Sequence, residues 1–587
     1  MRNQGEFQLQ PATRKPSSVS IDDRMARDWM GPDRSRNAET LHEAFHRVAV
    51  AIANAESYHA EAVEVRCLAE SFERMLSAMD FLPNSPTLLN AGTTVGVLSG
   101  CFVLPVTGEP DRDDDTLRLM TQLQQAGAGT GFSFLSLGDW PGGPSATEQL
   151  NQLLLRIDEA TRHNTSLSPR RGANMGVLRV DHPSIHAFIA SKRDGRSLPH
   201  FNLSVGLTDR FMDCAKHGKR FALRDPKTHR PTTRIWANDL LTAIAEAAWA
   251  SGDPGAVFLD AVERANPVPG LGPIHATNPC GEAPLLPFES CTLGSINLSN
   301  MLRDESSGGS GIDWRRLART TRLAVRFLDN VIDATRWPDE RVAKATRRTR
   351  KIGLGVMGFA DMLVRMRIAY DSPMAEQIAA QVMAFINHTA HNASEELADQ
   401  RGAFPAWDQS VFARTGVHLR NATCTSIAPT GTLSRIASVN PGIEPFFNFS
   451  QPSATSCQPI GRDCRALRHF ADETGHDLGA LLEHARQTGT LADAPGLRDS
   501  EARLFRTATQ ISAQQHLRIQ AAFQQNTDQS VSKTVNLPER TTAEEVKRVI
   551  TDAWELGLKG VTVFRWGCRS HQPFGPGREQ SRELLPG

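Results

Sequence analysis

Short apolar segments alternate with longer amphipathic ones over most of this 587-residue chain, and no other feature limits its fold as strongly. Cys101-Phe102-Val103-Leu104 and residues 201–205 are typical of buried strands, whereas residues 315–334 and 374–400 have helical spacing. Gly353-Leu354-Gly355 is interpreted as a glycine-rich turn between such elements. Strands that alternate with helices favour an α/β fold with parallel strands.

The two ends of the chain differ in composition from its middle. Apolar residues recur at helical spacing from Leu41 onward, which predicts two amphipathic helices before Pro83. Near the other end, Thr542-Ala543-Glu544-Glu545 predicts a capped helix that is followed by a last strand. The predicted divisions are a flexible polar arm (1–38), a helical region (39–82), the main α/β unit (83–568) and a polar tail (569–587).

Charge and hydropathy exclude several classes of protein. Lys plus Arg and Asp plus Glu both total 65, so nothing indicates a nucleic-acid surface or a basic membrane face. No segment has the 18 or so consecutive apolar residues of a membrane span, and the N-terminus lacks a signal-peptide core. The nine cysteines form no CxxC pair, so no zinc or other metal site is expected. We therefore expect a cytoplasmic protein.

Asn278, Cys280 and Glu282 form a triplet of chemically useful side chains. In an extended segment, alternate residues project to the same side, so these three could converge on one small ligand. A thiol between an amide and a carboxylate offers a hydrogen-atom donor, an orienting group and a general base. A polar turn around a buried, inert cysteine explains the triplet equally well, so both interpretations stay open.

The wider pattern around this triplet resembles the ribonucleotide reductase family. The matching segments follow the family's order over roughly residues 80–568. They are Leu82-Pro83-Asn84-Ser85-Pro86-Thr87, Ser99-Gly100-Cys101-Phe102-Val103-Leu104-Pro105, Gly127-Ala128-Gly129-Thr130-Gly131-Phe132, Arg170-Arg171-Gly172-Ala173-Asn174-Met175, Ala276-Thr277-Asn278-Pro279-Cys280-Gly281-Glu282, Glu289-Ser290-Cys291-Thr292-Leu293-Gly294-Ser295-Ile296-Asn297-Leu298, Ala428-Pro429-Thr430-Gly431-Thr432-Leu433-Ser434, Gly442-Ile443-Glu444-Pro445 and Val531-Ser532-Lys533-Thr534-Val535-Asn536.

The resemblance implies a fold and a set of catalytic residues. The fold is a ten-stranded α/β barrel made of two five-stranded parallel halves, with Cys280 on a finger loop in the interior. Cys280 would carry a thiyl radical that removes the ribose 3′ hydrogen. Glu282 would take the 3′-hydroxyl proton and Asn278 would hold the substrate hydroxyls. Cys101 and Cys291 would supply two electrons and close to a disulfide.

Substrate binding is expected at several further positions. Pro429, Thr430, Gly431, Thr432 and Leu433 begin a helix whose exposed backbone N–H groups suit an anion, although the same letters also make an ordinary helix start. The resemblance assigns this segment to the substrate diphosphate. It also implies that Ser85, Thr87, Gly100 and Gly129 line the substrate site.

The source of the radical separates the classes of this family. Relatives that use a separate metal subunit relay the radical through paired tyrosines near the C-terminus, but the only tyrosines here are Tyr58 and Tyr370. No glycyl-radical motif is present near the C-terminus. The residues within these motifs resemble those of the adenosylcobalamin-dependent class, which implies adenosylcobalamin as the cofactor.

Two departures from the family affect the expected partners. Beyond Phe564 only Cys568 remains, so we expect an external dithiol such as thioredoxin, or a partner protein carrying the missing cysteine arm. The segment after Phe134 is shorter than in relatives, which puts the specificity-effector site in doubt. The resemblance also implies a homodimer through helices between residues 140 and 200. The alternatives to a reductase are a related radical enzyme on another nucleotide and a catalytically silent nucleotide-binding paralogue.

Overall fold

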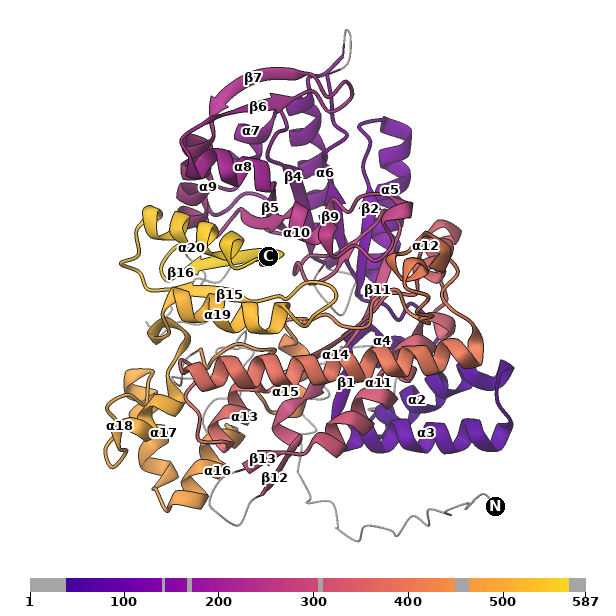
Figure 1. Ribbon diagram of the computed structural model, residues 1–587, viewed down its shortest axis with the longest axis vertical. Coiled ribbons are helices and arrows are strands. Elements are labelled where there is room, and N and C mark those ends of the chain that lie inside the picture. Colours follow the sequence, from indigo (N-terminus) through magenta and orange to yellow (C-terminus); the bar gives the residue numbers. More distant parts are fainter. Residues whose placement is uncertain are drawn as a thin grey trace.

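The computed structural model describes residues 39–139, 143–165, 172–304, 310–447, 449 and 464–569 (Figure 1). The expected arm of residues 1–38 and nearly all of the expected tail lie outside these residues, as do parts of the segments after Phe134 and before Gly172. Among the described residues, no helix combines the length and apolar character needed to cross a membrane.

Five parallel strands form one half of the central sheet. Each strand pairs with the next in chain order, which is the arrangement that helical crossovers produce. The strands are β2 (Cys101–Pro105), β3 (Gly129–Ser133), β4 (Asn174–Arg179), β5 (Phe201–Leu207) and β8 (Gly255–Phe258). The helices of this half are α5 (Pro110–Gln125), α6 (Ala146–Thr165), α7 (Ile185–Ala190), α8 (Asp209–Lys216), α9 (Ala237–Ser251) and α10 (Leu259–Arg264), and the hairpin β6 (Arg220–Arg224) and β7 (Pro231–Trp236) lies at the top of Figure 1.

The second half also consists of parallel strands. Strand β11 (Ser290–Asn297) pairs with β14 (Ile352–Met357), and β15 (Thr534–Leu537) pairs with β16 (Gly560–Arg565). Single parallel bridges from Leu354 to Thr425 and from Ile427 to Val531 connect these two pairs through residues 425–427. The halves meet at two antiparallel joints, β11 with β2 and β16 with β8. This topology confirms the expected α/β barrel of two parallel halves.

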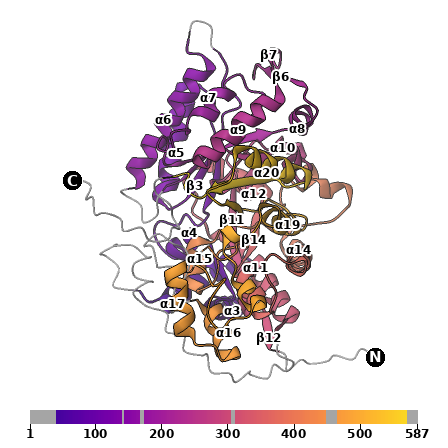
Figure 2. The same ribbon diagram turned by 90° about the vertical axis from the view of Figure 1, so that its left-hand side faces the viewer.

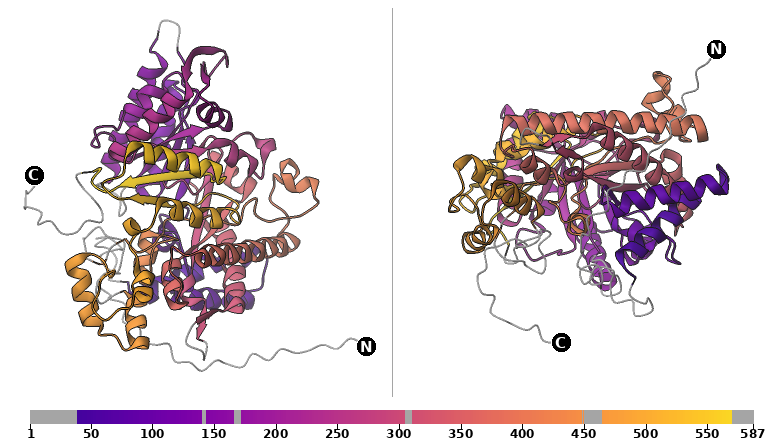
Figure 3. Two further views of the ribbon diagram at one scale, coloured as in Figure 1. Left: turned by 60° about the vertical axis from the view of Figure 1, so that its left-hand side comes forward. Right: turned by 90° about the horizontal axis from the view of Figure 1, so that it is seen from below.

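Helices cover the second half on its outer side. Figures 1 and 3 show α14 as a long helix across this half, with the N-terminal helix pair close to one of its ends. The helices are α11 (Trp314–Ala334), α12 (Glu340–Thr349), α13 (Phe359–Arg365), α14 (Pro373–Arg401), α15 (Gly431–Ala437), α16 (Arg465–Thr474), α17 (Leu478–Thr488), α18 (Asp499–Ala502), α19 (Ala513–Gln524) and α20 (Ala543–Glu555), and a small hairpin joins β12 (Leu302–Asp304) to β13 (Ser310–Ile312).

The two predicted N-terminal helices are confirmed as α2 (Leu41–Ala53) and α3 (Ala62–Ser77). A capping box begins α2: the Thr40 hydroxyl accepts from the Glu43 N–H, and the Glu43 carboxylate accepts from the Thr40 N–H. Phe72 of α3 packs edge-on against Phe327 of α11, at 4.9 Å between ring centres. The helix pair therefore shares the core of the second half, together with short strand β1 (Phe81–Pro83) and helix α4 (Ser85–Asn90).

A hairpin fills the interior of the barrel. Strands β9 (Ala276–Thr277) and β10 (Pro284–Leu285) pair antiparallel, and the turn between them carries Cys280. Alternate residues of the barrel strands point inward and pack on this hairpin, as a period of two requires. The cluster consists of Cys101, Val103, Met175, Val177, Ala276, Ala283, Leu285, Cys291 and Leu293. The hairpin is the finger loop that the resemblance implied.

The prediction of a glycine-rich turn at residues 353–355 is wrong. Gly353 and Gly355 lie inside the fully buried strand β14. A Cβ atom on Gly355 would lie 2.3 Å from the Ser426 carbonyl oxygen, so the glycine is needed for the close approach of the neighbouring segment.

Candidate active site

The finger loop turns sharply at its tip. Residues 278–283 form a turn rather than the extended segment that the sequence suggested, and Gly281 has a left-handed backbone with φ of 82°. The Asn278 side chain closes the turn by accepting from the Ala283 N–H at 3.0 Å. Asn278 and Glu282 are buried at 1% and 2% exposure, while Cys280 is exposed. The three side chains still converge, because all of them line one cavity.

Other residues tie the tip to both halves of the barrel. On the side of the first half, the Asn202 amide donates to the Pro279 carbonyl at 3.0 Å. On the opposite side, the Glu282 carbonyl accepts from the Ser426 hydroxyl at 2.8 Å and from the Ser530 N–H at 3.0 Å. The position of Cys280 is therefore set by contacts from elements far apart in the sequence.

Cys280 lies between two cavities. The first, of about 130 Å³, is lined by Cys280 and by most of the predicted site residues: Ser85, Gly100, Cys101, Gly129, Asn278, Glu282, Pro429, Thr430, Gly431, Thr432 and Leu433. The second, of about 310 Å³, borders Cys280 and strands β5, β8 and β16. A larger cavity of about 400 Å³ contains none of the predicted residues and is lined by Arg179, His275 and the β6–β7 turn.

Cys101 and Cys291 face each other across a joint between the halves. They are directly opposed in the antiparallel register of β2 and β11. Opposed residues of such a pair have Cα atoms roughly 4.5–5.5 Å apart, within the range of about 4.4–6.8 Å that a disulfide requires. Both are thiols in this structure. Their separation therefore permits a disulfide without movement of the backbone.

The two thiols have different surroundings. Cys101 lines the smaller cavity and accepts from the Asn278 amide at 3.0 Å. Cys291 lies behind it with no exposed surface, and its sulfur accepts from the Gln529 amide at 3.1 Å. Burial raises the pKa of Cys291 to about 12 and that of Cys101 well above its usual value.

The segment predicted to bind a diphosphate lies at the start of α15. Thr430 precedes the helix with a left-handed backbone, at φ of 55°, and its hydroxyl accepts from the Gly442 N–H at 2.7 Å. The first N–H groups of a helix have no partner within the helix, and residues 431–433 line the cavity that holds Cys280. An anion at this end of the cavity would meet these donors.

Two predicted residues do not line the cavity. Thr87 is fully buried, and its hydroxyl donates to the Leu98 carbonyl at 2.9 Å and to the Asn84 side chain at 3.1 Å. Cys291 lies behind Cys101. Thr87 thus helps to fix the start of helix α4, which carries Ser85, and does not itself reach the cavity.

The sequence interpretation missed Gly131 and Gln529. A Cβ atom on Gly131 would lie 1.8 Å from the Thr277 carbonyl oxygen, so this inward-facing position must be bare for the finger loop to pass. The signal was available, because glycine alternates at residues 127, 129 and 131. Gln529 contacts Cys291 across 238 positions of sequence, and no local pattern indicates that contact.

A buried ion pair supports the strand that carries Cys291. Lys351 donates to Glu289 at 2.6 Å, and both side chains are at most 2% exposed. The second Glu289 oxygen accepts from the Thr349 hydroxyl at 2.6 Å. The oxygen that Lys351 contacts also accepts from the Leu286 N–H at 2.7 Å, so Lys351 contributes the balancing charge of this carboxylate rather than its only hydrogen bonds.

We expect Lys351→Met to lower the free energy of unfolding by about 3–5 kcal/mol, because it leaves the Glu289 charge buried without its partner. Urea denaturation followed by circular dichroism measures this. The control is Lys216→Met, which removes a pair with Glu555 that water already surrounds. Equal stability of the Lys351 and Lys216 variants would contradict the role given to the buried pair.

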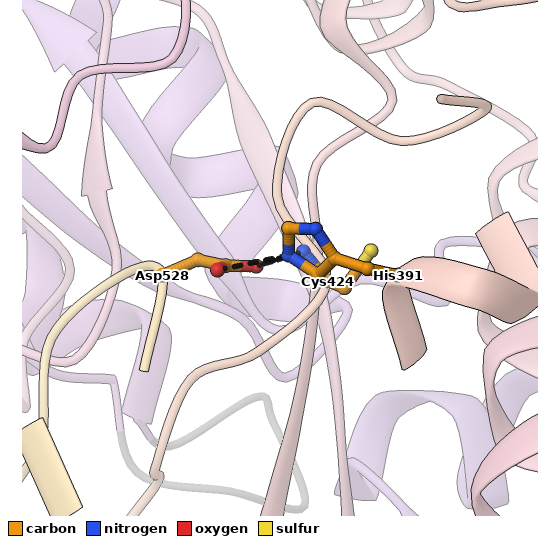
Figure 4. A group of neighbouring side chains, drawn as sticks. All are labelled: His391, Cys424 and Asp528. Atoms are coloured by element: carbon orange, nitrogen blue, oxygen red, sulfur yellow. Dashed lines mark hydrogen bonds and ion pairs between the residues drawn. The ribbon is translucent and has the colours of Figure 1, made fainter. Parts of the chain in front are cut away.

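One group among the described residues has metal-ligating side chains close together. Atoms of His391, Cys424 and Asp528 lie within 4.8 Å of one another (Figure 4). The Asp528 carboxylate accepts from His391 at 3.0 Å and from the Cys424 N–H at 2.7 Å. Burial alone would raise the pKa of Asp528, but His391 and the hydrogen-bond donors hold it well below its usual value. These contacts connect His391 of α14 and Cys424 to Asp528, the residue that directly precedes Gln529.

The chain matches two family models along most of its length. The model described as "Ribonucleotide reductase, all-alpha domain" matches residues 26–96, and the one described as "Ribonucleotide reductase, barrel domain" matches residues 99–419 and 415–564.

Curated relatives and a solved structure agree with these models. The chain is 44% identical over 549 residues to a protein of Mycobacterium tuberculosis (strain CDC 1551 / Oshkosh) named vitamin B12-dependent ribonucleoside-diphosphate reductase, covering 92% of this chain and 78% of the relative. It is 42% identical to a Thermoplasma acidophilum protein of the same name, covering 87% and 67%. The Actinobacillus ureae class Id ribonucleotide reductase alpha subunit has a similar fold, with a TM-score of 0.74, 22% identity and coverage of 92% and 98%.

Proposed function

The chain belongs to the ribonucleotide reductase large-subunit family, and from this we propose that it reduces ribonucleoside diphosphates to 2′-deoxyribonucleotides with a thiyl radical on Cys280. The observation that carries the proposal is the position of Cys280, which borders one cavity with Glu282, Asn278 and Cys101 and a second cavity on its other side. We assign the first cavity, which Glu282, Asn278 and Cys101 border, to the reacting part of the substrate, and the second to the radical source.

The residues around Cys280 divide the chemistry among them. The Cys280 sulfur takes the ribose 3′ hydrogen atom and returns it at the end of the reaction. Glu282 accepts the 3′-hydroxyl proton while the 2′-hydroxyl leaves as water, and Asn278 orients the hydroxyls. Cys101 and Cys291 supply two electrons and two protons as they close to a disulfide. Burial of Glu282 and Asn278 supports these roles, because it keeps bulk water from competing with the substrate hydroxyls for these two side chains.

The relatives named as vitamin B12-dependent support a cobalamin cofactor, and we propose the adenosyl form. The cofactor supplies, when bound, a cobalt–carbon bond whose homolysis provides the oxidising equivalent for the Cys280 thiol. The cavity of about 310 Å³ fits a nucleoside-sized group, since small-molecule sites begin near 300 Å³. Asn202, Ser204, Asn536 and Phe564 would hold it from strands β5, β15 and β16.

We assign the substrate diphosphate to residues 429–433 at the start of α15. These residues line the cavity that holds Cys280, and the first N–H groups of a helix have no partner within the helix, so they suit an anion without any basic side chain. Ser85, Gly100 and Gly129 would then lie against the ribose and base, since they line the same cavity.

The reductant and the oligomeric state also belong to this proposal. We assign reduction of the cysteine pair to an external dithiol of the thioredoxin type, because Cys101 borders the substrate cavity and can be reached from it. A homodimer through α6 is consistent with the position of that helix at the edge of the molecule, where Leu155 is 64% exposed (Figure 2).

The identity to two reductases favours reduction over the alternatives raised by the sequence. A catalytically silent paralogue has no need of Cys101, Asn278, Cys280, Glu282 and Cys291 together, and all five are present. A radical enzyme for a different nucleotide is less well supported, because relatives at 42% and 44% identity are named for ribonucleoside diphosphates.

An assay with purified protein tests the proposed function. Adenosylcobalamin, dithiothreitol and each of four ribonucleoside diphosphates should give the matching deoxynucleotide, with the corresponding triphosphates as comparison. We expect turnover to require the cofactor and the diphosphates to react faster. Absence of product and of cofactor cleavage with every nucleotide would refute ribonucleotide reduction, and faster reaction of the triphosphates would refute the diphosphate assignment.

A further inference from the structure

The two thiols of the predicted redox pair differ in accessibility. Cys101 borders the cavity of about 130 Å³, which also holds Cys280, whereas Cys291 has no exposed surface and does not border it. A reductant that enters from the cavity therefore meets the Cys101 sulfur first. Attack on a disulfide needs access to the attacked sulfur along the line of the sulfur–sulfur bond.

The charges around the two sulfurs also differ. The negative charge of Glu282 disfavours a thiolate at both sulfurs, and Glu289 adds to this at Cys291, while the Asn278 amide favours a thiolate at Cys101. Behind Cys291 lie the Gln529 amide and the Lys351 ammonium, and both favour a thiolate against the cost of burial. Lys351 is shared with Glu289 at 2.6 Å, so the direct contribution to the sulfur comes from Gln529.

The Gln529 amide is held in place for this contact. Its nitrogen lies 3.1 Å from the Ile352 carbonyl oxygen, 2.9 Å from the Thr423 hydroxyl and 3.1 Å from the Cys291 sulfur, so its two hydrogens are shared among these three acceptors. The Ile352 carbonyl fixes which end of the amide faces the sulfur, because only an N–H group can lie against it. The backbone carbonyl of Gln529 accepts from the Lys559 ammonium at 2.6 Å, which holds the main chain in place.

We propose that the external reductant attacks the Cys101 sulfur and that Cys291 is the leaving thiolate, with Gln529 as the positioning residue that donates to the departing sulfur. This inference rests on the proposed function only for the claim that the disulfide forms during turnover. The direction of its reduction follows from the accessibility of Cys101 and the burial of Cys291 behind it.

The electrons and bonds of this step balance. A reductant thiolate forms a bond to the Cys101 sulfur as the bond between Cys101 and Cys291 breaks, and Cys291 leaves with the electron pair and then takes a proton. The second thiolate of the dithiol attacks the reductant sulfur of the mixed disulfide. Cys101 then leaves as a thiolate and is protonated, and the dithiol has become a disulfide.

A trapping experiment tests the direction of attack. Diamide oxidises the full-length protein, so that the Cys101–Cys291 disulfide is made without turnover, and peptide mass spectrometry verifies the linked peptides. Brief treatment with the monothiol 2-mercaptoethanol, followed by an acid quench and alkylation, should leave the adduct on Cys101 and alkylated Cys291. An adduct mainly on Cys291 would overturn the proposal, and so would the failure of diamide to link the two peptides.

A variant tests the role of Gln529 separately. Gln529→Met keeps the length of the side chain but removes the donor, and it should slow reduction of the disulfide by 2-mercaptoethanol about tenfold, because a hydrogen bond to a charged sulfur is lost. The matched control is Gln520→Met, another buried glutamine, which donates to the Gly560 carbonyl at 2.9 Å and contacts neither cysteine.

The two variants distinguish positioning from general support of the fold. Reduction by 2-mercaptoethanol should be slower in Gln529→Met than in Gln520→Met although both variants unfold at the same urea concentration, and the steady-state kcat with dithiothreitol should fall in Gln529→Met alone. An equal slowing in Gln520→Met, or a slowing that follows the loss of stability in both variants, would show that Gln529 acts only through stability. Unchanged reduction in Gln529→Met would also overturn its assigned role.

Discussion

Cys280→Ala abolishes deoxynucleotide formation and leaves nucleotide binding intact. We expect a loss of about 10⁴-fold or more, as when one member of a catalytic unit is removed. The reason is chemical, because alanine has no S–H bond from which a radical can be made at the tip of the finger loop. Alanine also fits the exposed position of Cys280 between the two cavities without a clash. Product analysis and equilibrium binding of the diphosphate measure the two effects separately.

The matched control for this variant is Cys67→Ala. Cys67 is an exposed thiol on α3, remote from the barrel interior, and its removal should leave the rate at the wild-type value. Measurable multiple turnover in Cys280→Ala would contradict the assignment of the radical to this residue. Loss of nucleotide binding in the same variant would show instead that the substitution disturbs the loop.

Gly131→Ala displaces the finger loop and should reduce turnover about 10²-fold, because a shift of roughly 1 Å at a reacting group has that effect. The added Cβ atom would lie 1.8 Å from the Thr277 oxygen and 2.8 Å from the Thr277 carbonyl carbon. Both are backbone atoms, so neither can rotate away. Thr277 lies only three residues before Cys280, so the displacement reaches the sulfur.

The same substitution should lower the free energy of unfolding by about 1–3 kcal/mol, as overpacking of a core does. Gly479→Ala in α17 is the control, since its Cβ would meet only the flexible Asp477 side chain. Steady-state kinetics and urea denaturation measure both variants. If Gly131→Ala were as active as Gly479→Ala, this would contradict the close contact of Gly131 with the backbone of the finger loop.

Local sequence predicted the elements whose signals are local. The apolar period of residues 315–334 and 374–400 is confirmed by α11 and α14, and Thr542 begins α20 with the predicted capping box. The strands at Cys101 and Phe201 are confirmed as β2 and β5. In each of these segments, propensity and burial pattern favour the same structure, so no distant contact has to override them.

The errors occurred where a distant contact decides the local structure. Glycines at 353 and 355 indicate a turn when they are considered alone, yet they lie in a buried strand because the Ser426 backbone approaches too closely for a side chain. The triplet around Cys280 converges through a turn whose shape depends on Asn202, Ser426 and Ser530. Periodicity carries no information about such contacts.

The candidate site was predicted mainly by resemblance, and the pairing of its cysteines illustrates why. Nothing in the sequence near Cys101 or Cys291 indicates that they face each other, because their register depends on how two halves of a barrel join. The contact of Gln529 with Cys291 has the same origin. Residues that act through a neighbouring strand have no local signature, whereas a motif such as residues 429–433 has one.

One single-turnover measurement tests the central claim most directly. Fully reduced protein is mixed with adenosylcobalamin and one ribonucleoside diphosphate, and no external reductant is added. Deoxynucleotide and the linked peptides of Cys101 and Cys291 are then quantified together. The proposed chemistry predicts about one deoxynucleotide per chain, with an equal amount of the Cys101–Cys291 disulfide. Absence of deoxynucleotide, or its formation while both thiols stay reduced, would contradict it.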